Sequence, residues 1–272
     1  MSLNIYEGFT NKDTMNLDDE IHLKIESVKA AFSDGLFNIT DFDITKDVIP
    51  ELLSKNYSDS KRKLINKNKA NHYEPTIKID TSNTVYITVV DEDGNGCSFI
   101  NSLYQGFGSG IVVPETGIFL QNRGSSFSLD KNHPNYLQPN KRPFHTLIPG
   151  MVTKDKDLKY CYGVMGGMQQ AQGHFQVLTN LIDKGMTPQE ALDYPRFSVV
   201  PWDDEEKDIK KDTVLIESIF DNDLINKLKQ IGHKIIVSDP TPNFGGGQII
   251  ELNGNIIIGG SEPRKDGQAI GI

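Results

Sequence analysis

Apolar residues near the start of the chain recur with the period of an α-helix. Four of them share one helical face: Ile21, Ile25, Val28 and Phe32. They follow Asp18 and Asp19, whose negative charge favours a helix N-terminus. A second helical stretch is predicted from Pro50 towards Ile65. The polar run after it, up to Pro75, is typical of an exposed connection, so we predict a boundary between residues 68 and 83.

The pattern becomes extended after this connection. Residues 84–90 and 97–103 alternate as strands do, and the polar run 91–96 between them predicts a β-hairpin. Further strands are predicted at residues 117–121, 147–152, 159–164, 213–216, 234–237, 248–252 and 256–259. Helices are predicted at residues 170–184, 188–192 and 221–231, with Gly185 and Gly232 closing the first and the third. Strands, helices and strands again indicate a layered α+β domain.

Composition limits the classes of partner. The chain has 37 acidic and 28 basic residues and a net charge of −9, which argues against nucleic acid and anionic membranes as partners. No apolar run reaches the roughly 18 residues of a membrane span. The first residues have no apolar stretch like that of a signal peptide, so we expect a cytoplasmic location.

Cysteine and histidine usage indicates neither a disulfide nor a metal. Cys97 and Cys161 each lie in an apolar, strand-like run, so we expect two buried free thiols. The six histidines show no metal-ligand spacing: His22, His72, His133, His145, His174 and His233. We therefore expect no metal and no cofactor.

Thr84 is the first candidate for chemistry. It opens the predicted hairpin behind the polar, turn-forming residues Thr81, Ser82 and Asn83. A hydroxyl at such a junction could attack the carbonyl that precedes it, and cleavage would leave Thr84 with both a hydroxyl and a free α-amino group. One residue would then carry nucleophile and base. The alternative interpretation is a threonine chosen only for its β-propensity.

A glycine pair is the second candidate. Gly166 and Gly167 lie between a predicted strand and a predicted helix, where backbone N–H groups can turn towards an anion as in an oxyanion hole. The alternative is a plain tight turn.

Seven sequence blocks occur in a specific order after residue 83: TVYITVVDEDGNG, FGSGIVVPETGIFLQNR, PNKRPFHTLIP, VMGGMQQAQ, ALDYPRF, GGGQIIE and SEPRKDG. This order resembles the catalytic subunit of the γ-glutamyltranspeptidase family, and residues 1–83 resemble the C-terminal end of that family's large subunit. The resemblance implies an N-terminal-nucleophile (Ntn) hydrolase with a four-layer αββα sandwich, incomplete here because the N-terminal half is absent. It divides the chain into a helical segment with a linker, residues 1–83, and a catalytic domain, residues 84–272.

The resemblance also implies roles for individual residues. Thr84 is the expected nucleophile, and Asn83–Thr84 is the bond expected to cleave itself. Ser102 takes the place of a threonine that supports the nucleophile, and Gly166 and Gly167 match the glycines of the oxyanion hole.

The residues expected to bind the substrate depart from the family pattern. Tyr104, Arg123 and Ser126 stand where typical members have an asparagine, a glutamine and an aspartate that hold the glutamyl amino and carboxyl groups. His145 and Thr146 replace two serines that hold the carboxylate. Loss of the aspartate removes the partner of a substrate ammonium, so an acidic or neutral acyl donor facing Arg123 fits better than a γ-glutamyl donor. A structural salt bridge is the alternative role of Arg123.

Two hypotheses follow from different classes. The first is a self-cleaving amidohydrolase or acyltransferase that moves a γ-glutamyl or related acyl group from a small-molecule amide to water or an amine. The second is a non-catalytic, uncleaved half-protein that needs a missing N-terminal segment. As protein partners we expect an N-terminal large-subunit fragment and consider a homodimer. The Lys141-Arg142-Pro143 run is predicted to support a loop.

Overall fold

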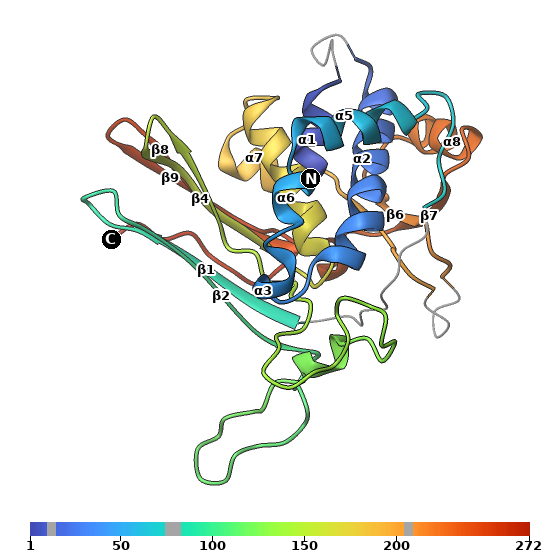
Figure 1. Ribbon diagram of the computed structural model, residues 1–272. Coiled ribbons are helices and arrows are strands. Elements are labelled where there is room, and N and C mark those ends of the chain that lie inside the picture. The colour runs from blue at the N-terminus through green and yellow to red at the C-terminus, as the bar shows by residue number, and fades with distance from the viewer. Residues whose placement is uncertain (10–14, 74–82, 204–208) are drawn as a thin grey trace. The chain divides into compact units, whose positions relative to one another are not determined.

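The computed structural model describes residues 1–9, 15–73, 83–203 and 209–272 (Figure 1). The chain forms two compact units, and each is assembled from three stretches of sequence. The first unit contains Met1–Ile79, Gly124–His145 and Phe197–Asp239, and the second contains Asp80–Arg123, Thr146–Arg196 and Pro240–Ile272. The first change of unit falls inside the boundary predicted at residues 68–83. The later changes show that the compact units interleave along the chain. The division into a helical segment and a catalytic domain stays a prediction.

The second unit contains a two-stranded and a four-stranded sheet. The hairpin strands β1 (Asn83–Val90) and β2 (Gly96–Tyr104) pair antiparallel. The larger sheet has the order β3-β4-β8-β9 and is antiparallel throughout, with strands β3 (Gly150–Lys154), β4 (Asp157–Met165), β8 (Gly246–Asn253) and β9 (Ile256–Ser261). Two helices, α6 (Gln169–Ile182) and α7 (Pro188–Asp193), complete the unit.

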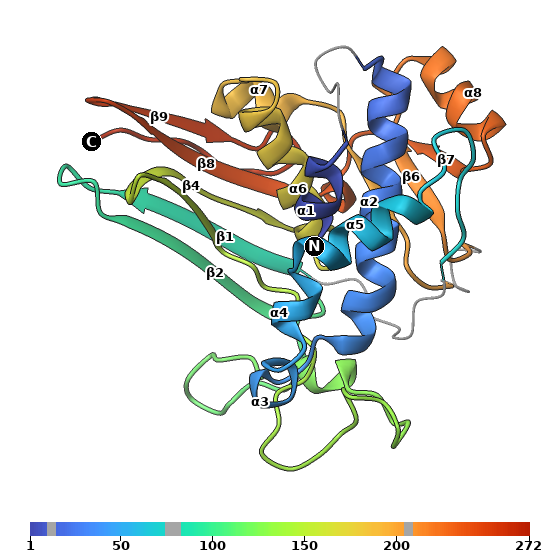
Figure 2. The ribbon, with the colours of Figure 1, turned by 45° about the horizontal axis from the view of Figure 1, so that its top comes forward.

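Alternation along β4 separates the two faces of the larger sheet. Tyr160, Tyr162 and Val164 point into a core shared with α6 and α7, whose members include Val177, Leu181, Ala191 and Leu192. The residues between them face the hairpin, and the Thr88 hydroxyl donates to the Cys161 carbonyl over 3.4 Å. The second unit is therefore built as helices, sheet and hairpin in three layers (Figure 2).

The first unit is mainly helical. Its helices are α1 (Ser2–Glu7), α2 (Leu17–Asn38), α3 (Phe42–Thr45), α4 (Ile49–Leu52), α5 (Lys55–Leu64) and α8 (Asn222–Gln230). Its sheet has the order β5-β6-β7, with β5 (Phe197–Val199), β6 (Thr213–Glu217) and β7 (Lys234–Ser238). Strands β6 and β7 are parallel, and α8 is the helical connection between them. The predicted α+β class is confirmed.

Local chemistry explains where the elements begin and end. Helix α2 begins after Asn16, whose side chain accepts from the Asp19 N–H, and three acidic residues follow in its first turn. The helix predicted from Pro50 towards Ile65 is two helices, because the Ser54 side chain accepts from the Tyr57 N–H and starts a new helix there.

Some predicted elements were wrong. Residues 117–121 contribute only an isolated bridge between Val112 and Phe119, in a loop where Glu115 and Gly117 have positive φ angles. The strand predicted at residues 147–152 begins only at Gly150. The predicted turn residues Thr81 and Ser82 lie outside the described residues.

Both cysteines are free, as predicted, but only Cys161 is buried. Cys97 is exposed because it lies on the outer face of the hairpin, opposite Val89. Among the described residues, no helix is both long enough and apolar enough to cross a lipid bilayer.

A buried carboxylate joins three segments of the second unit. Glu262 forms ion pairs of 2.8 Å with Arg196 and 2.7 Å with Arg264, and all three side chains are at most 3% exposed. Glu262 also accepts from the Gly247 N–H over 2.9 Å. Arg196 donates to the Phe244 carbonyl over 3.2 Å, so the entry into β8 is held at both Phe244 and Gly247.

We expect Glu262→Gln to lower the free energy of unfolding by about 3–5 kcal/mol, because two buried guanidinium groups would lose their anionic partner. Denaturant unfolding followed by circular dichroism measures the change. The control is Asp43→Asn, which removes an exposed pair with Lys46 and should cost less than about 1 kcal/mol. Equal losses in the two variants would contradict this prediction.

Candidate active site

Thr84 lies at the start of β1, on the inner face of the hairpin. It is half-buried and shares this face with the buried ring of Tyr86. The Thr84 hydroxyl donates to Ser102 Oγ on the neighbouring strand over 3.3 Å. Ser102 Oγ also accepts from the Tyr104 N–H over 2.9 Å. The structure therefore brings together the predicted nucleophile and the predicted supporting hydroxyl.

Tyr104, Arg123 and Thr146 form a second group in the same unit. Tyr104 pairs with Asn83 across the hairpin and is 1% exposed. The Arg123 guanidinium lies 4.6 Å from the centre of the Tyr104 ring and donates to the Thr146 hydroxyl over 2.8 Å. Burial lowers the pKa of Arg123 from its ordinary value. Three of the five predicted substrate-binding residues thus lie together at the end of the hairpin that carries Thr84.

The glycine pair forms the turn between β4 and α6. Gly166 and Gly167 have φ angles of +130° and +59°, and their carbonyls accept from the N–H groups of Gln169 and Gln170. A side chain at position 166 would lie 3.1 Å from the Gly245 Cα. Only glycine suits this position, both for its φ angle and for this close approach.

Gln170 connects the glycine turn to Thr84. Its backbone N–H donates to the Gly167 carbonyl over 3.1 Å, while its side-chain amide donates to Thr84 Oγ1 over 3.5 Å. A single residue therefore contacts both candidate catalytic elements. Gln170 could not be recognised from the sequence, because a glutamine in the first turn of a helix has no distinctive pattern.

Ser126 and His145 belong to the first unit. The Ser126 hydroxyl is buried and donates to the Phe144 carbonyl over 3.1 Å, which is a contact that stabilises a loop. His145 is exposed. Their predicted roles in substrate binding stay predictions.

Lys141 stabilises its loop, as predicted. Its ammonium donates to the Tyr136 carbonyl over 2.9 Å and to the Pro134 carbonyl. The neighbouring Arg142 N–H donates to Asp41 Oδ2 over 2.7 Å. Because Asp41 is the N-cap residue of α3, this bond connects the loop to the start of that helix.

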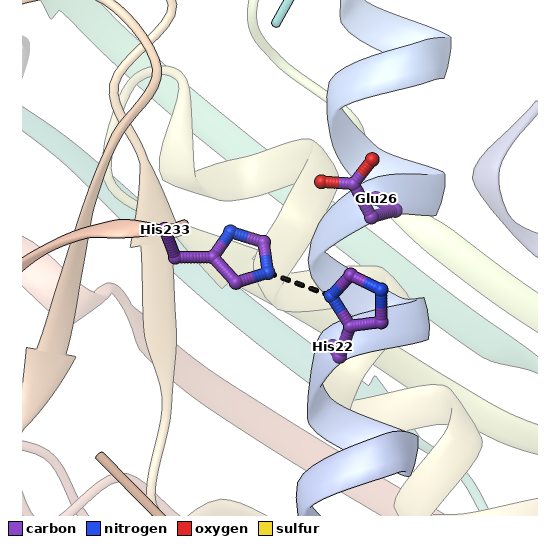
Figure 3. A group of neighbouring side chains, drawn as sticks. All are labelled: His22, Glu26 and His233. Carbon is purple, nitrogen blue, oxygen red and sulfur yellow. Dashed lines mark hydrogen bonds between the residues drawn. The ribbon is translucent and has the colours of Figure 1, made fainter. Parts of the chain in front are cut away.

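A second cluster of titratable groups lies in the first unit. His22 and Glu26 lie one turn apart on α2, and His233 lies just before β7 (Figure 3). One ligand atom from each lies within 4.8 Å of the others, which is the spacing of a metal site. Sequence patterns do not indicate this cluster, because His233 is adjacent to His22 and Glu26 only in the folded chain.

Hydrogen bonds explain the cluster without an ion. His22 Nε2 faces the Asn66 carbonyl at 2.8 Å and must donate to it, so His22 Nδ1 is the acceptor for His233 Nε2 at 2.7 Å. His233 Nδ1 then accepts from the Lys29 ammonium at 3.4 Å. Lys29 also lies 3.5 Å from Glu26 Oε1. The lysine already supplies the positive charge that a metal would bring, so we interpret the cluster as a buried polar network that stabilises the unit.

The chain belongs to the γ-glutamyltranspeptidase family, whose family model it matches over residues 1–272. It is 37% identical over 276 residues to the glutathione hydrolase-like YwrD proenzyme of Bacillus subtilis, covering 100% of this chain and 51% of that protein. It is also 37% identical over 191 residues to the oxamate amidohydrolase proenzyme of Klebsiella pneumoniae, covering 69% of this chain and 35% of that protein.

A solved structure supports the same assignment. Cephalosporin acylase from Bacillus halodurans superimposes with a TM-score of 0.85 and is 44% identical, covering 98% of this chain and 47% of that one. The present chain spans about half the length of the curated relative it matches from end to end. The fold and the family predicted from the sequence are confirmed.

We expect acid to destabilise the chain through His22 and His233. Both would take up protons near pH 6.5 when unfolded, whereas burial lowers the pKa of His22 and lowers that of His233 to about 2 in the folded chain. Stability is therefore lost as the pH falls below 6.5. Burial raises the pKa of Glu26 to about 7, which opposes this loss, so the part due to the histidines is the difference in slope between the wild type and a variant that lacks both. Urea unfolding between pH 8 and pH 5 measures the slope.

The double variant His22→Gln with His233→Gln serves as the control. It should be less stable than the wild type at pH 8, because a buried network is broken, and it should lose less stability on acidification than the wild type does. The same acid slope in the variant and the wild type would show that other groups are responsible.

Proposed function

We propose that this protein is a self-cleaving threonine amidohydrolase or acyltransferase of the γ-glutamyltranspeptidase family. The observation that carries the proposal is the position of Thr84. Its hydroxyl lies between Ser102 Oγ and the Gln170 amide, and Gln170 itself is bonded to the glycine turn. Nucleophile, supporting hydroxyl and candidate oxyanion site thus occupy one end of the second unit.

Activation begins with the chain's own backbone. The Thr84 hydroxyl attacks the Asn83 carbonyl, the C–N bond breaks, and the resulting ester is hydrolysed by water. The new α-amino group of Thr84 then serves as base. It accepts the hydroxyl proton as Thr84 attacks a substrate amide, and it passes the proton to the departing amine. The N–H groups of Gly166 and Gly167 stabilise the oxyanion, and water or an amine resolves the acyl ester.

The acyl donor we propose is a small amide with a carboxylate and no neighbouring ammonium. Arg123 provides a buried positive charge next to the Tyr104 ring and the Thr146 hydroxyl. A carboxylate gains most from such a group, because charge-assisted bonds to a guanidinium are strong in a buried site. Ser126 is uncharged and bonded to a carbonyl, so it offers no counter-charge to an ammonium. The name of one relative, an oxamate amidohydrolase, fits a donor of this class.

The outer face of the hairpin indicates the protein partner. Four apolar side chains alternate on it and are 51–71% exposed: Val85, Ile87, Val89 and Phe99. A contiguous apolar face of this kind is typical of a buried interface. We propose that a segment N-terminal to this sequence covers this face of the hairpin as the fourth layer, consistent with relatives twice as long.

Native mass spectrometry tests this partner. In the full-length protein it would detect the N-terminal segment bound to the fragment beginning at Thr84.

Self-cleavage tests the proposed function directly. We expect full-length protein incubated at neutral pH to yield a fragment that begins at Thr84, detected by intact mass and N-terminal sequencing. Thr84→Ala should stay whole because it has no hydroxyl to attack the Asn83 carbonyl. Thr88→Ala, on the same strand and face, is the control and should cleave like the wild type. A wild-type chain that stays intact for days would favour the non-catalytic half-protein.

Acyl-donor choice is tested with p-nitroanilides. We expect a glutaryl donor to be preferred to a γ-glutamyl donor, because the two differ by the ammonium group. Arg123→Met should lower kcat/KM for the glutaryl donor about 10–100-fold, which corresponds to the roughly 1.5–3 kcal/mol of a hydrogen bond to a charged group. The same variant should have little effect on kcat/KM for a neutral acyl donor. Arg142→Met, an exposed cation, is the control. An equal effect of Arg123→Met on both donors would exclude a carboxylate at Arg123.

A further inference from the structure

Gln170 lies in the first turn of α6 and is fully buried. Its side-chain amide has one contact on each side. The Ile148 N–H lies 3.2 Å from Gln170 Oε1, and Thr84 Oγ1 lies 3.5 Å from Gln170 Nε2. A buried amide with both ends engaged has a defined orientation, unlike an amide at the surface.

The Ile148 N–H sets that orientation. A backbone N–H can only donate, so the amide oxygen of Gln170 must face Ile148. The NH₂ group then necessarily faces Thr84. The reverse orientation would place two donors against each other at Ile148 and leave both without an acceptor in a buried site.

Thr84 consequently has a donor on one side and an acceptor on the other. The Gln170 amide donates to Thr84 Oγ1, and the Thr84 hydroxyl donates to Ser102 Oγ. Ser102 Oγ is itself held by the Tyr104 N–H. This sequence of bonds fixes the direction of the Thr84 proton towards Ser102 and restricts the position of the reacting oxygen.

We propose that Gln170 is a positioning residue for Thr84, which couples the nucleophile to the glycine turn and to the loop that carries Thr146. The coupling follows from its three bonds: the side chain to Thr84, the backbone N–H to Gly167, and the side-chain oxygen to Ile148, two residues after Thr146. Its effect on reaction rates rests on the proposed function, whereas its contact with Thr84 can be tested without any activity.

The contact is tested through a thiol at position 84. In full-length Thr84→Cys protein that also carries Cys97→Ser, the pH dependence of iodoacetamide alkylation, followed by peptide mass on the uncleaved chain, gives the thiol pKa. Gln170→Glu keeps an acceptor for Ile148 and replaces the donor that faces position 84 with an acceptor. We expect it to raise the thiol pKa by about one unit or more, because a nearby carboxylate disfavours the thiolate.

Gln172→Glu is the matched control, since Gln172 is also a buried glutamine of α6. It should leave the thiol pKa close to that of the Thr84→Cys, Cys97→Ser protein without a change in α6. Equal thiol pKa values in the Gln170→Glu and Gln172→Glu proteins would overturn the proposal.

Rates then test the consequence for the reaction in the Thr84 protein. We expect Gln170→Met to slow self-cleavage and to lower kcat for the preferred donor about tenfold or more, with a smaller change in KM. Gln172→Met should cost similar stability in urea and leave both rates near the wild-type values. Equal rate losses in the two methionine variants would show that Gln170 contributes only through packing and would overturn the proposal.

A failure of the proposed function can be distinguished from a failure of the proposal for Gln170. A wild-type protein that neither cleaves itself nor hydrolyses any donor would end that proposal, while a shifted thiol pKa in Gln170→Glu would still establish that Gln170 positions residue 84.

Discussion

The geometry of the candidate active site depends on one buried carboxylate. Glu262 forms ion pairs with both Arg196 and Arg264 in a region with almost no solvent contact, and it also accepts from the Gly247 N–H. An unpaired charge at this depth would be very costly, so the arrangement is held as a set. The segment that it fixes includes Gly245, which lies against Gly166 of the glycine turn. These ion pairs thereby stabilise the backbone conformation on which oxyanion binding would depend.

Two layers of the second unit meet at this turn. Strand β4 buries its tyrosines and Val164 against α6 and α7, and its other face packs on the hairpin. The end of β4 is therefore close both to the start of α6 and to the start of β1. Since α6 begins two residues after Gly167, Gln170, a buried residue of its first turn, can reach Thr84. The site arises where strand, turn and helix meet, and each of its members has a structural neighbour that limits its movement.

Periodicity predicted those parts of the fold whose burial alternates regularly. The hairpin and α6 were predicted to within a few residues, and the existence and apolar face of α2 were predicted without its end, because their apolar positions repeat with period 2 or 3.6. Strand β5 was missed because its three residues are all buried and show no alternation. The pairing of Arg123 with Thr146 and the cluster of His22 with His233 could not be predicted, since each joins residues far apart in sequence. The position of Thr84 at the start of the hairpin left its role open, and the family resemblance made it the expected nucleophile.

The hairpin is irregular at the bond that we propose is cleaved. Its register shifts between Asn83 and Val85, and Tyr104, which pairs with Asn83, has a φ angle of +78°. A left-handed conformation costs a non-glycine residue roughly 1–2 kcal/mol, and such strain persists only where the surroundings impose it. Here the buried ring of Tyr104 packs under Arg123, and the Tyr104 N–H donates to Ser102. A peptide bond in a regular ladder is restrained by its neighbours on both sides. The Asn83–Thr84 bond lies where that regularity ends, so it can deform towards a tetrahedral intermediate at lower cost than a bond within the ladder.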